Sequence, residues 1–276
     1  MDRRLTPGNE RVALDGWQDR ISAARYVPGE AARLAPALAD LLKAPDGPRD
    51  RQLVHGARLL VIERQAGWAF VQALADGYCG WLPEDALASA RPATHWLCVP
   101  ASHLYQGPKV QHPVVMPLFM GAQLTVTGQA GAWAETPAGF VPACHLKPMG
   151  HALDDPASVA QMFLHTPYLW GGNSHAGLDC SGLAQISFAA CGIQIPGDSD
   201  LQTRSGTPIP ESAPLQRNDL LFWKGHVAIC LSATRMIHAT GAFMAVIEED
   251  IAAAVARIEA AGDGPVTHRR RLAVSP

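Results

Sequence analysis

Apolar and polar residues alternate in short runs through residues 46–149, and glycines separate most of these runs. This pattern is typical of short antiparallel strands joined by tight turns. Residues 1–45 favour a different organisation, an irregular segment followed by one amphipathic helix over residues 29–42. Proline-rich connectors then divide the chain near residues 44–48, 91–92 and 147–150.

An internal repeat lies within the strand-rich region. The segment Gly56-Ala-Arg-Leu-Leu-Val61 recurs as Gly121-Ala-Gln-Leu-Thr-Val126, and Trp68 recurs as Trp133 at the same offset of 65 residues. Each copy ends in a segment that joins glycine, an aromatic residue and proline. We therefore predict two small β-barrels, over residues 46–91 and 92–149, each with a core that is marginal for its size.

The last part of the chain, residues 150–276, combines helical and strand patterns. Because a helix pair precedes several strands that follow one another closely, we expect an α+β domain with an antiparallel sheet. The predicted helices are 156–165, 180–191 and 251–261, and the predicted strands are 220–223, 226–231, 235–239, 243–248 and 266–274.

Composition indicates a folded globular protein, since 48% of residues are hydrophobic and 17% are charged. The formal charge of −3 gives no electrostatic reason to expect nucleic acid or a membrane surface as partner. The first residues carry charges but no apolar run of the kind found in signal peptides. The six cysteines show no paired spacing. Because no export signal is visible either, we expect reduced thiols and a cytoplasmic location.

Cys180 has the most reactive context of the six. It stands at the junction between a turn-rich segment with Trp-Gly-Gly and a helical pattern, where Asp179 or Ser181 can cap the first turn. The helix dipole and the free backbone N–H groups at such a position favour negative charge. We therefore expect an exposed thiol with a lowered pKa.

Two histidines follow Cys180 on neighbouring predicted strands. His226 opens one strand and His238 lies in the next, an order typical of papain-like thiol hydrolases. Cys180 would attack a carbonyl, His226 would hold the thiolate and protonate the leaving amine, and His238 would orient His226. The backbone N–H of Cys180 would bind the oxyanion. By ligand type alone, a zinc site of these three residues is an alternative.

Five ordered blocks resemble the NlpC-type family of bacterial cell-wall peptidases. The blocks are Pro167-Tyr-Leu-Trp-Gly-Gly, Leu178-Asp-Cys-Ser-Gly-Leu, Asp219-Leu-Leu-Phe-Trp, His226-Val-Ala-Ile and Met236-Ile-His-Ala. The two repeats resemble bacterial SH3-like domains. The resemblance implies a papain-like catalytic domain over residues 150–276 behind two SH3-like barrels, and it implies no cofactor or metal.

The same resemblance implies a substrate. Family members mostly cut the bond between γ-D-glutamate and a diamino acid in cell-wall stem peptides. The branch with two SH3-like domains trims free murein peptides that carry an N-terminal L-alanine. The matching substrate-binding positions are Tyr168, Asp179, Ser181, Asp198 and Ser199.

Further contacts are predicted. The same resemblance implies a role for Tyr78, which matches a tyrosine of the family's first SH3-like domain that helps to read the substrate amine. Its expected acidic partner is missing, because Ala57 follows Gly56 where glutamate is expected, and Asp76 or Asp179 would take that role. Trp170, from the Trp-Gly-Gly block, is a further predicted contact. Arg204 is another, as a carboxylate partner on charge grounds.

The leading hypothesis is thus a γ-D-glutamyl-L-diamino acid endopeptidase for free murein peptides. An amidase or acyltransferase on the same thiol scaffold is one alternative. A non-catalytic module that binds cell-wall peptides is another. The sequence leaves open whether the diamino acid is meso-diaminopimelate or lysine, and it does not determine the oligomeric state.

Overall fold

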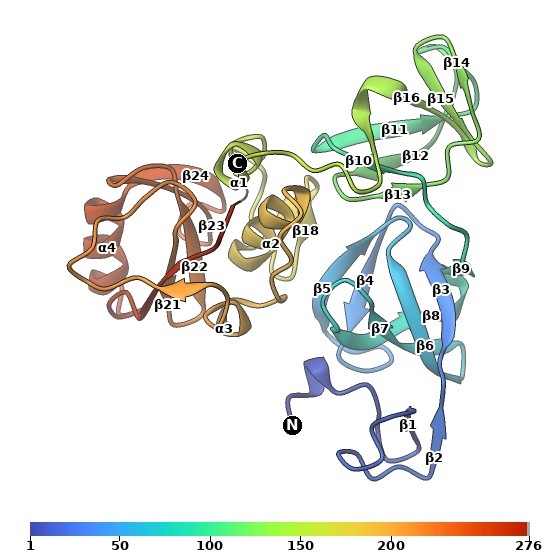
Figure 1. Cartoon of the computed structure of the whole chain (residues 1–276), viewed down its shortest axis with the longest axis horizontal. Coiled ribbons are helices and arrows are strands. Elements are labelled where there is room, and N and C mark those ends of the chain that lie inside the picture. Colours follow the sequence, from blue (N-terminus) through green and yellow to red (C-terminus); the bar gives the residue numbers. More distant parts are fainter. Residues whose placement is uncertain (275–276) are drawn as a thin grey trace. The chain divides into compact units, whose positions relative to one another are not determined.

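The structure is a computed structural model that describes residues 1–274. The chain divides into two compact units, one over Met1–Met149 and one from Gly150 onward (Figure 1). The boundary coincides with the proline-containing connector near residues 147–150. Each unit has its own core, and each is described by itself.

The N-terminal segment is part of the first unit. It contains η1 (Arg3–Leu5) and the parallel pair β1 (Val12–Leu14) and β2 (Arg25–Val27). Val12 and Leu14 pack into an apolar cluster with Phe70 and Trp81 of the first barrel. The segment therefore covers an outer face of that barrel.

The first barrel is a seven-stranded sheet with the order β5-β4-β8-β7-β6-β3-β9. Its strands are β3 (Glu30–Leu34), β4 (Leu38–Leu42), β5 (Arg49–Val54), β6 (Arg58–Gln65), β7 (Trp68–Ala73), β8 (Cys79–Pro83) and β9 (Leu87–Ser89). A short helix, η2 (Glu84–Ala86), precedes β9.

The helix predicted over residues 29–42 is wrong, because β3 and β4 occupy this range. Pro36 lies between the two strands, where in a helix it would remove a hydrogen bond and clash with the preceding turn. Ala32 and Leu34 are buried alternately on one face of β3, as the period of a strand requires. The first barrel thus begins near Glu30 rather than at residue 46.

The second barrel repeats the pattern in two smaller sheets, with the orders β12-β11-β16-β15-β14 and β13-β10-β17. Its strands are β10 (His95–Leu97), β11 (Ala101–Tyr105), β12 (Val114–Phe119), β13 (Gln123–Leu124), β14 (Gly128–Ala130), β15 (Trp133–Thr136), β16 (Gly139–Pro142) and β17 (Leu146–Pro148). Trp68 opens β7 and Trp133 opens β15, so the sequence repeat corresponds to a structural repeat. A third short helix, η3 (Ala143–His145), follows β16 as η2 follows β8.

The second unit is built around a six-stranded sheet with the order β20-β25-β21-β22-β23-β24. Its elements are α1 (Pro156–Gln161), β18 (Asn173–Ser174), β19 (Gly177–Leu178), α2 (Cys180–Ala190), α3 (Ser199–Gln202), β20 (Thr207–Pro208), β21 (Leu220–Trp223), β22 (His226–Cys230), β23 (Arg235–Thr240), β24 (Ala245–Asp250), α4 (Ile251–Ala260) and β25 (His268–Arg271). Figure 1 shows the sheet between α2 and α4.

The apolar faces of the sheet explain this arrangement. Ala228 and Met236 pack with Ala254 and Ile258 of α4 in one cluster. Helix α2 contacts β22 and β23 of the sheet, and it also packs against α1. The predicted α+β fold is confirmed, with the antiparallel sheet next to the helix that starts at Cys180.

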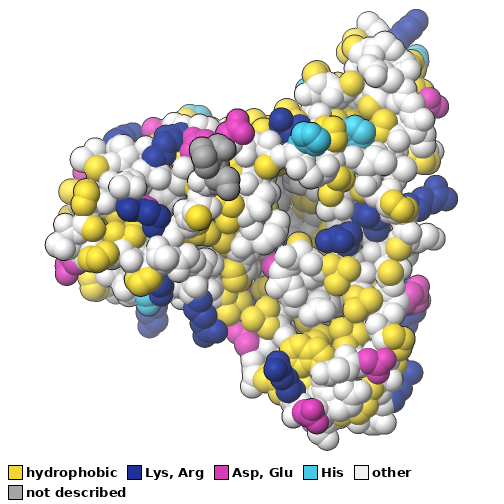
Figure 2. Space-filling model, viewed as in Figure 1, with side chains coloured by type: hydrophobic (Ala, Val, Ile, Leu, Met, Phe, Trp, Pro, Cys, Tyr) yellow, Lys and Arg dark blue, Asp and Glu magenta, His cyan; other side chains and the backbone are white. Residues whose placement is uncertain are grey.

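The surface shows no concentration of one charge on the face seen in Figure 2. Lys and Arg side chains stand apart there and alternate with carboxylates and apolar side chains. Across residues 1–274, the helices are too short or too polar to span a bilayer.

Candidate active site

Helix α2 begins at Cys180 because Asp179 caps it. The Asp179 carboxylate accepts hydrogen bonds from the backbone N–H of Gly182 at 2.6 Å and from the hydroxyl of Ser181 at 2.9 Å. It also accepts one from the backbone N–H of Gly171 at 2.9 Å. One buried carboxylate thus fixes both the first turn of α2 and the Trp-Gly-Gly segment.

The glycines of these two motifs allow the helix start to lie against the preceding turn. A Cβ atom on Gly182 would stand 2.3 Å from the carbonyl oxygen of Gly172. A Cβ atom on Gly172 would in turn stand 2.5 Å from the carbonyl oxygen of Gly177. Both approaches are closer than any real side chain permits, so glycine is required at both positions.

The Cys180 thiol is buried, with 7% of the residue exposed. It donates a long hydrogen bond of 3.9 Å to the carbonyl of Gly225, the residue before His226. Burial, with a smaller contribution from the Asp179 charge, raises the pKa of Cys180 to about 12. The backbone N–H groups of Val227 and Ser181 and that of Cys180 itself oppose this rise.

The prediction of an exposed thiol with a lowered pKa is therefore wrong for the free protein. The sequence correctly places the thiol at a helix N-terminus, where N–H groups favour the thiolate. In the folded unit, however, loss of hydration outweighs those groups.

The structure brings the two predicted histidines together. Nε2 of His226 and Nδ1 of His238 lie 2.8 Å apart, within hydrogen-bond distance. Burial is the main cause that lowers the pKa of His226, to about 3, and it also lowers the pKa of His238. Trp223 packs beside the His226 ring with 5.6 Å between ring centroids. Both imidazoles are thus neutral near pH 7.

Glu249 extends this pair and was not among the predicted residues. Its Oε2 lies 2.9 Å from Nε2 of His238, and Arg257 donates two hydrogen bonds to the same carboxylate. The predicted strand ended at residue 248, which left Glu249 in the connection to the next helix. The register pairs Glu249 with Met236, two residues from His238, and this pairing could have indicated the contact.

Tyr168, Asp179 and Asp198 share the surroundings of the thiol. Burial raises the pKa of the Tyr168 hydroxyl, with smaller contributions from the charges of Cys180 and Asp179. Burial raises the pKa of Asp179 as well, and the Asp198 charge adds to the rise. Asp198 has a φ of 25°, a strained value for a residue other than glycine.

Ser199 and Gln202 belong to α3, which the sequence did not predict. Ser199 is buried at the first position of this helix. The fully buried Gln202 donates hydrogen bonds of 3.0 Å to the carbonyls of Ser181 and Pro196. Gln202 therefore connects α3 with the first turn of α2, and no motif pointed to this role.

The other predicted contacts have different surroundings. Trp170 is 70% exposed, and Arg204 is exposed in the turn after α3. Tyr78 is buried in the core of the first barrel, where the Arg51 guanidinium lies over its ring at 5.1 Å. Asp76 forms an ion pair with Arg51. The structure leaves the roles of these residues toward substrate as predictions.

The zinc alternative receives no support from the geometry. Across residues 1–274, no three His, Cys, Asp or Glu side chains converge as a bound metal ion would require. The Cys180 thiol contacts the carbonyl of Gly225, the residue before His226, and His226 contacts His238.

Comparison with known proteins shows which family the chain belongs to. Residues 165–255 match the NlpC/P60 family, and residues 41–87 match the bacterial dipeptidyl-peptidase Sh3 domain. A γ-D-glutamyl-L-lysine dipeptidyl-peptidase of Bacillus subtilis is 30% identical over 213 residues, which cover 68% of this chain and 71% of the relative. The chain belongs to the NlpC/P60 family.

Other similarities extend over most of this NlpC/P60 chain. A γ-D-glutamyl-L-lysine dipeptidyl-peptidase of Bacillus cereus is 27% identical over 222 residues, and the chain spans 66% of that relative's length. The crystal structure of an NlpC/P60 family protein from Bacillus cereus superimposes with a TM-score of 0.74 at 22% identity. The superimposed residues cover 88% of this chain and 99% of the chain in that structure. The family and its relatives identify the second unit as a cysteine peptidase domain.

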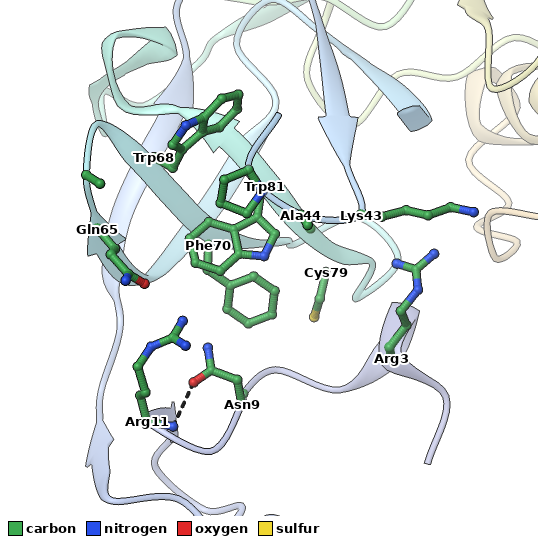
Figure 3. Close-up of a pocket in the computed structure, with 14 residues that line it drawn as sticks. Arg3, Asn9, Arg11, Lys43, Ala44, Gln65, Trp68, Phe70, Cys79 and Trp81 are labelled. Carbon is green, nitrogen blue, oxygen red and sulfur yellow. Dashed lines mark hydrogen bonds between the residues drawn. The ribbon is translucent and has the colours of Figure 1, made fainter. Parts of the chain in front are cut away.

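The first unit of the NlpC/P60 protein has a pocket of its own, separate from the predicted site residues. It has a volume of about 540 Å³ and lies between the N-terminal segment and the first barrel (Figure 3). Trp68, Phe70 and Trp81 lie on the barrel side of this pocket, and Arg11 is among the residues of the N-terminal segment. Arg11 pairs with Glu63 at 2.7 Å, a contact that fixes this wall of the pocket to the barrel.

Proposed function

We propose that the protein is a cysteine endopeptidase that hydrolyses the γ-D-glutamyl–L-diamino acid bond of murein stem peptides. One observation carries the proposal. The thiol of Cys180 lies at the start of α2, beside the strand that His226 opens, and His238 holds the far side of the His226 ring. The names of the Bacillus relatives support the choice of a γ-D-glutamyl bond.

The first half of the reaction forms an acyl-enzyme. Nε2 of His226 is engaged with His238, which leaves Nδ1 as the ring nitrogen for the thiol proton. His226 takes that proton as the Cys180 sulfur attacks the γ-carbonyl carbon of D-glutamate. The backbone N–H of Cys180 stabilises the oxyanion, and the proton passes to the departing amine of the diamino acid.

The second half releases the L-Ala-γ-D-Glu part. A water molecule gives a proton to Nδ1 of His226 as its oxygen attacks the thioester carbon. The C–S bond then breaks, the carboxylic acid leaves, and the proton returns to sulfur. Because burial disfavours a lone charge on either Cys180 or His226, each proton transfer is coupled to bond formation.

Two carboxylates near the thiol suit a substrate with a free amine. Asp198 is close enough to Asp179 for its charge to raise the pKa of the Asp179 carboxyl beyond the effect of burial. An ammonium group placed between them would offset this repulsion. Tyr168 and Ser181 can donate to the α-carboxylate of D-glutamate, although Ser181 must first turn away from Asp179. This arrangement supports a free N-terminal L-alanine.

The proposal is tested by incubating the full chain with L-Ala-γ-D-Glu-L-Lys, with its meso-diaminopimelate counterpart, and with the N-acetylated form of each. Mass spectrometry of the products identifies the bond that is cut. We expect release of the diamino acid from the free peptides and at least about tenfold slower release from the acetylated ones, because acetylation removes the ammonium charge. Equal rates on free and acetylated peptides would overturn the amine-binding role of the carboxylates.

A further inference from the structure

A continuous line of hydrogen bonds runs from the catalytic histidine to helix α4. His226 contacts His238, His238 contacts Glu249, and Glu249 receives two hydrogen bonds from Arg257. We propose that Glu249, held by Arg257, is a positioning residue that sets the tautomers of both histidines and so directs the lone pair of His226 Nδ1 toward the thiol. This inference rests on the proposed thiol mechanism, but its geometry can be tested without substrate.

The argument begins at the carboxylate. An ionised carboxylate only accepts hydrogen bonds, so the contact of 2.9 Å requires that Nε2 of His238 carry the hydrogen. A neutral imidazole carries one N–H, and therefore Nδ1 of His238 is an acceptor. The contact of 2.8 Å then requires that Nε2 of His226 be the donor. The remaining nitrogen, Nδ1 of His226, is left as the base.

Arg257 keeps the Glu249 carboxylate in the role of hydrogen-bond acceptor. It donates to Oε2 of Glu249 at 2.6 Å and to Oε1 at 3.1 Å. Burial alone would raise the pKa of the Glu249 carboxyl, but the bonds from Arg257 and the contact with His238 hold that pKa below its usual range. The carboxylate thus stays ionised and cannot become a donor.

The groups around His238 also favour its neutral form. Burial lowers the pKa of His238, and the Arg257 charge adds to this effect, while Glu249 opposes both. A doubly protonated His238 would donate from Nδ1 and force the opposite tautomer on His226. Keeping His238 neutral therefore preserves the order of donors and acceptors.

Helix α4 supplies the fixed end of the line. The Arg257 guanidinium lies 5.2 Å from the centre of the Phe243 ring, a cation–π contact that limits its position. Ala254 and Ile258, on either side of Arg257 in the helix, pack into the sheet core. These contacts hold the Arg257 guanidinium beside the Glu249 carboxylate.

The test is Glu249→Ala, with Glu248→Ala as the matched control on the same strand. Oε2 of Glu249 contacts both His238 and Arg257, so a glutamine can keep its amide oxygen at that position, whereas alanine removes the acceptor. Nothing then fixes the hydrogen on Nε2 of His238, and both tautomers of each histidine become populated. Glu248 is bonded instead to Gln161 at 2.8 Å and to Arg235 at 3.4 Å. We expect kcat to fall at least about tenfold in Glu249→Ala with KM little changed, because outer groups that fix a tautomer have effects of this size or larger.

The readout specific to this inference is ¹⁵N NMR of the histidine rings in the full chain near pH 7. We expect Nε2–H tautomers for His226 and His238 in the wild type, in Glu248→Ala and in Glu249→Asp, and a mixture of both tautomers in Glu249→Ala. We also expect Glu249→Asp to retain more activity than Glu249→Ala, since it keeps an acceptor.

Wild-type kcat in Glu249→Ala would overturn the inference, and so would a loss of kcat with unchanged tautomers. If the Glu249 variant fails to fold, Arg257→Gln is measured in its place. We expect this variant to weaken the preference of His238 for the Nε2–H tautomer. If the wild type cleaves no γ-D-glutamyl peptide, the proposed function fails, whereas the tautomer measurement still decides this inference.

Discussion

At the scale of single residues, Cys180 and His226 both lose hydration when the chain folds. Burial raises the pKa of the thiol to about 12 and lowers the pKa of the imidazole to about 3. A charge on one residue alone is thus disfavoured, and in the proposed mechanism a proton passes from one to the other only as part of the reaction. That these two residues react together stays a prediction from the motif. The motif did not indicate the shifts of their pKa values, which depend on how deeply β22 and α2 cover them.

The first prediction concerns the pH dependence of kcat/KM. The groups facing His226 are His238, which itself has a lowered pKa, and the Arg257 cation, and both add to the effect of burial. Because His226 must be unprotonated to accept the thiol proton, activity is lost only when the pH falls below its lowered pKa. We therefore expect the acid limb of the profile well below pH 6.5, the ordinary value for histidine.

This profile is measured with the full chain on a γ-D-glutamyl peptide. An acid limb at or above pH 6.5 would mean that His226 is hydrated in solution, contrary to its burial in the fold. Asp179 lies in the same site and burial raises the pKa of its carboxyl, so Asp179→Asn is measured as well to assign the limb.

The second prediction concerns Gly182. A methyl group at this position would meet the carbonyl oxygen of Gly172 at 2.3 Å, so Gly182→Ala must displace the turn or the helix start. We expect a loss of about 1–3 kcal/mol in the free energy of unfolding, the usual cost of overpacking, together with reduced kcat. Chemical denaturation measures the first quantity.

Gly241→Ala is the control, since nothing lies within 4 Å of the Cβ atom added there. It should leave both stability and activity nearly unchanged. Equal behaviour of the two variants would contradict the close approach of α2 to the Trp-Gly-Gly turn.

At the scale of elements, the start of α2 is the feature on which the site depends. Asp179 caps this helix and also binds the backbone of Gly171, so one carboxylate orders two segments. Asp250 caps α4 in the same way, by accepting a hydrogen bond of 3.0 Å from the N–H of Ala253. It is not part of the line of hydrogen bonds that joins His226, His238, Glu249 and Arg257. The two aspartates allow capping to be separated from catalysis.

The third prediction compares Asp179→Ala with Asp250→Ala. Each loses an N-cap, which costs about 0.5–2 kcal/mol of stability. We expect a loss of this size in Asp250→Ala with kcat/KM kept, and a larger loss in Asp179→Ala with kcat/KM strongly reduced. Thermal unfolding and peptide cleavage measure the two effects. Similar kcat/KM values in both variants would show that Asp179 acts only as a cap.

Elements of the second unit were largely predictable. The strand at Leu220–Trp223 and the helix starts at Cys180 and Ile251 agree with the sequence pattern. The short helix α3 was not predictable, because four residues carry no helical period. Residues 29–42 gave a wrong prediction, since their alanines favour a helix and tertiary pairing with β6 and β9 decided otherwise.

At the scale of the whole molecule, the sequence predicted the order of domains through the repeat and the five blocks. It could not predict that the first barrel starts near Glu30, or that the N-terminal segment packs on that barrel. These features arise from contacts between residues far apart in the chain. Glu249 and Arg257 were not predicted for the same reason, since only the fold brings α4 and β24 together at His238.

The central claim is that Cys180 attacks the γ-D-glutamyl bond, and one reaction tests it most directly. Wild type and Cys180→Ala are incubated with L-Ala-γ-D-Glu-L-Lys and its meso-diaminopimelate counterpart, and the products are identified by mass spectrometry. We predict that the wild type releases L-Ala-γ-D-Glu and the diamino acid, and that Cys180→Ala releases neither. An unchanged melting temperature of Cys180→Ala would show that this variant is folded. Cleavage by Cys180→Ala, or no cleavage of either peptide by the wild type, would contradict the account.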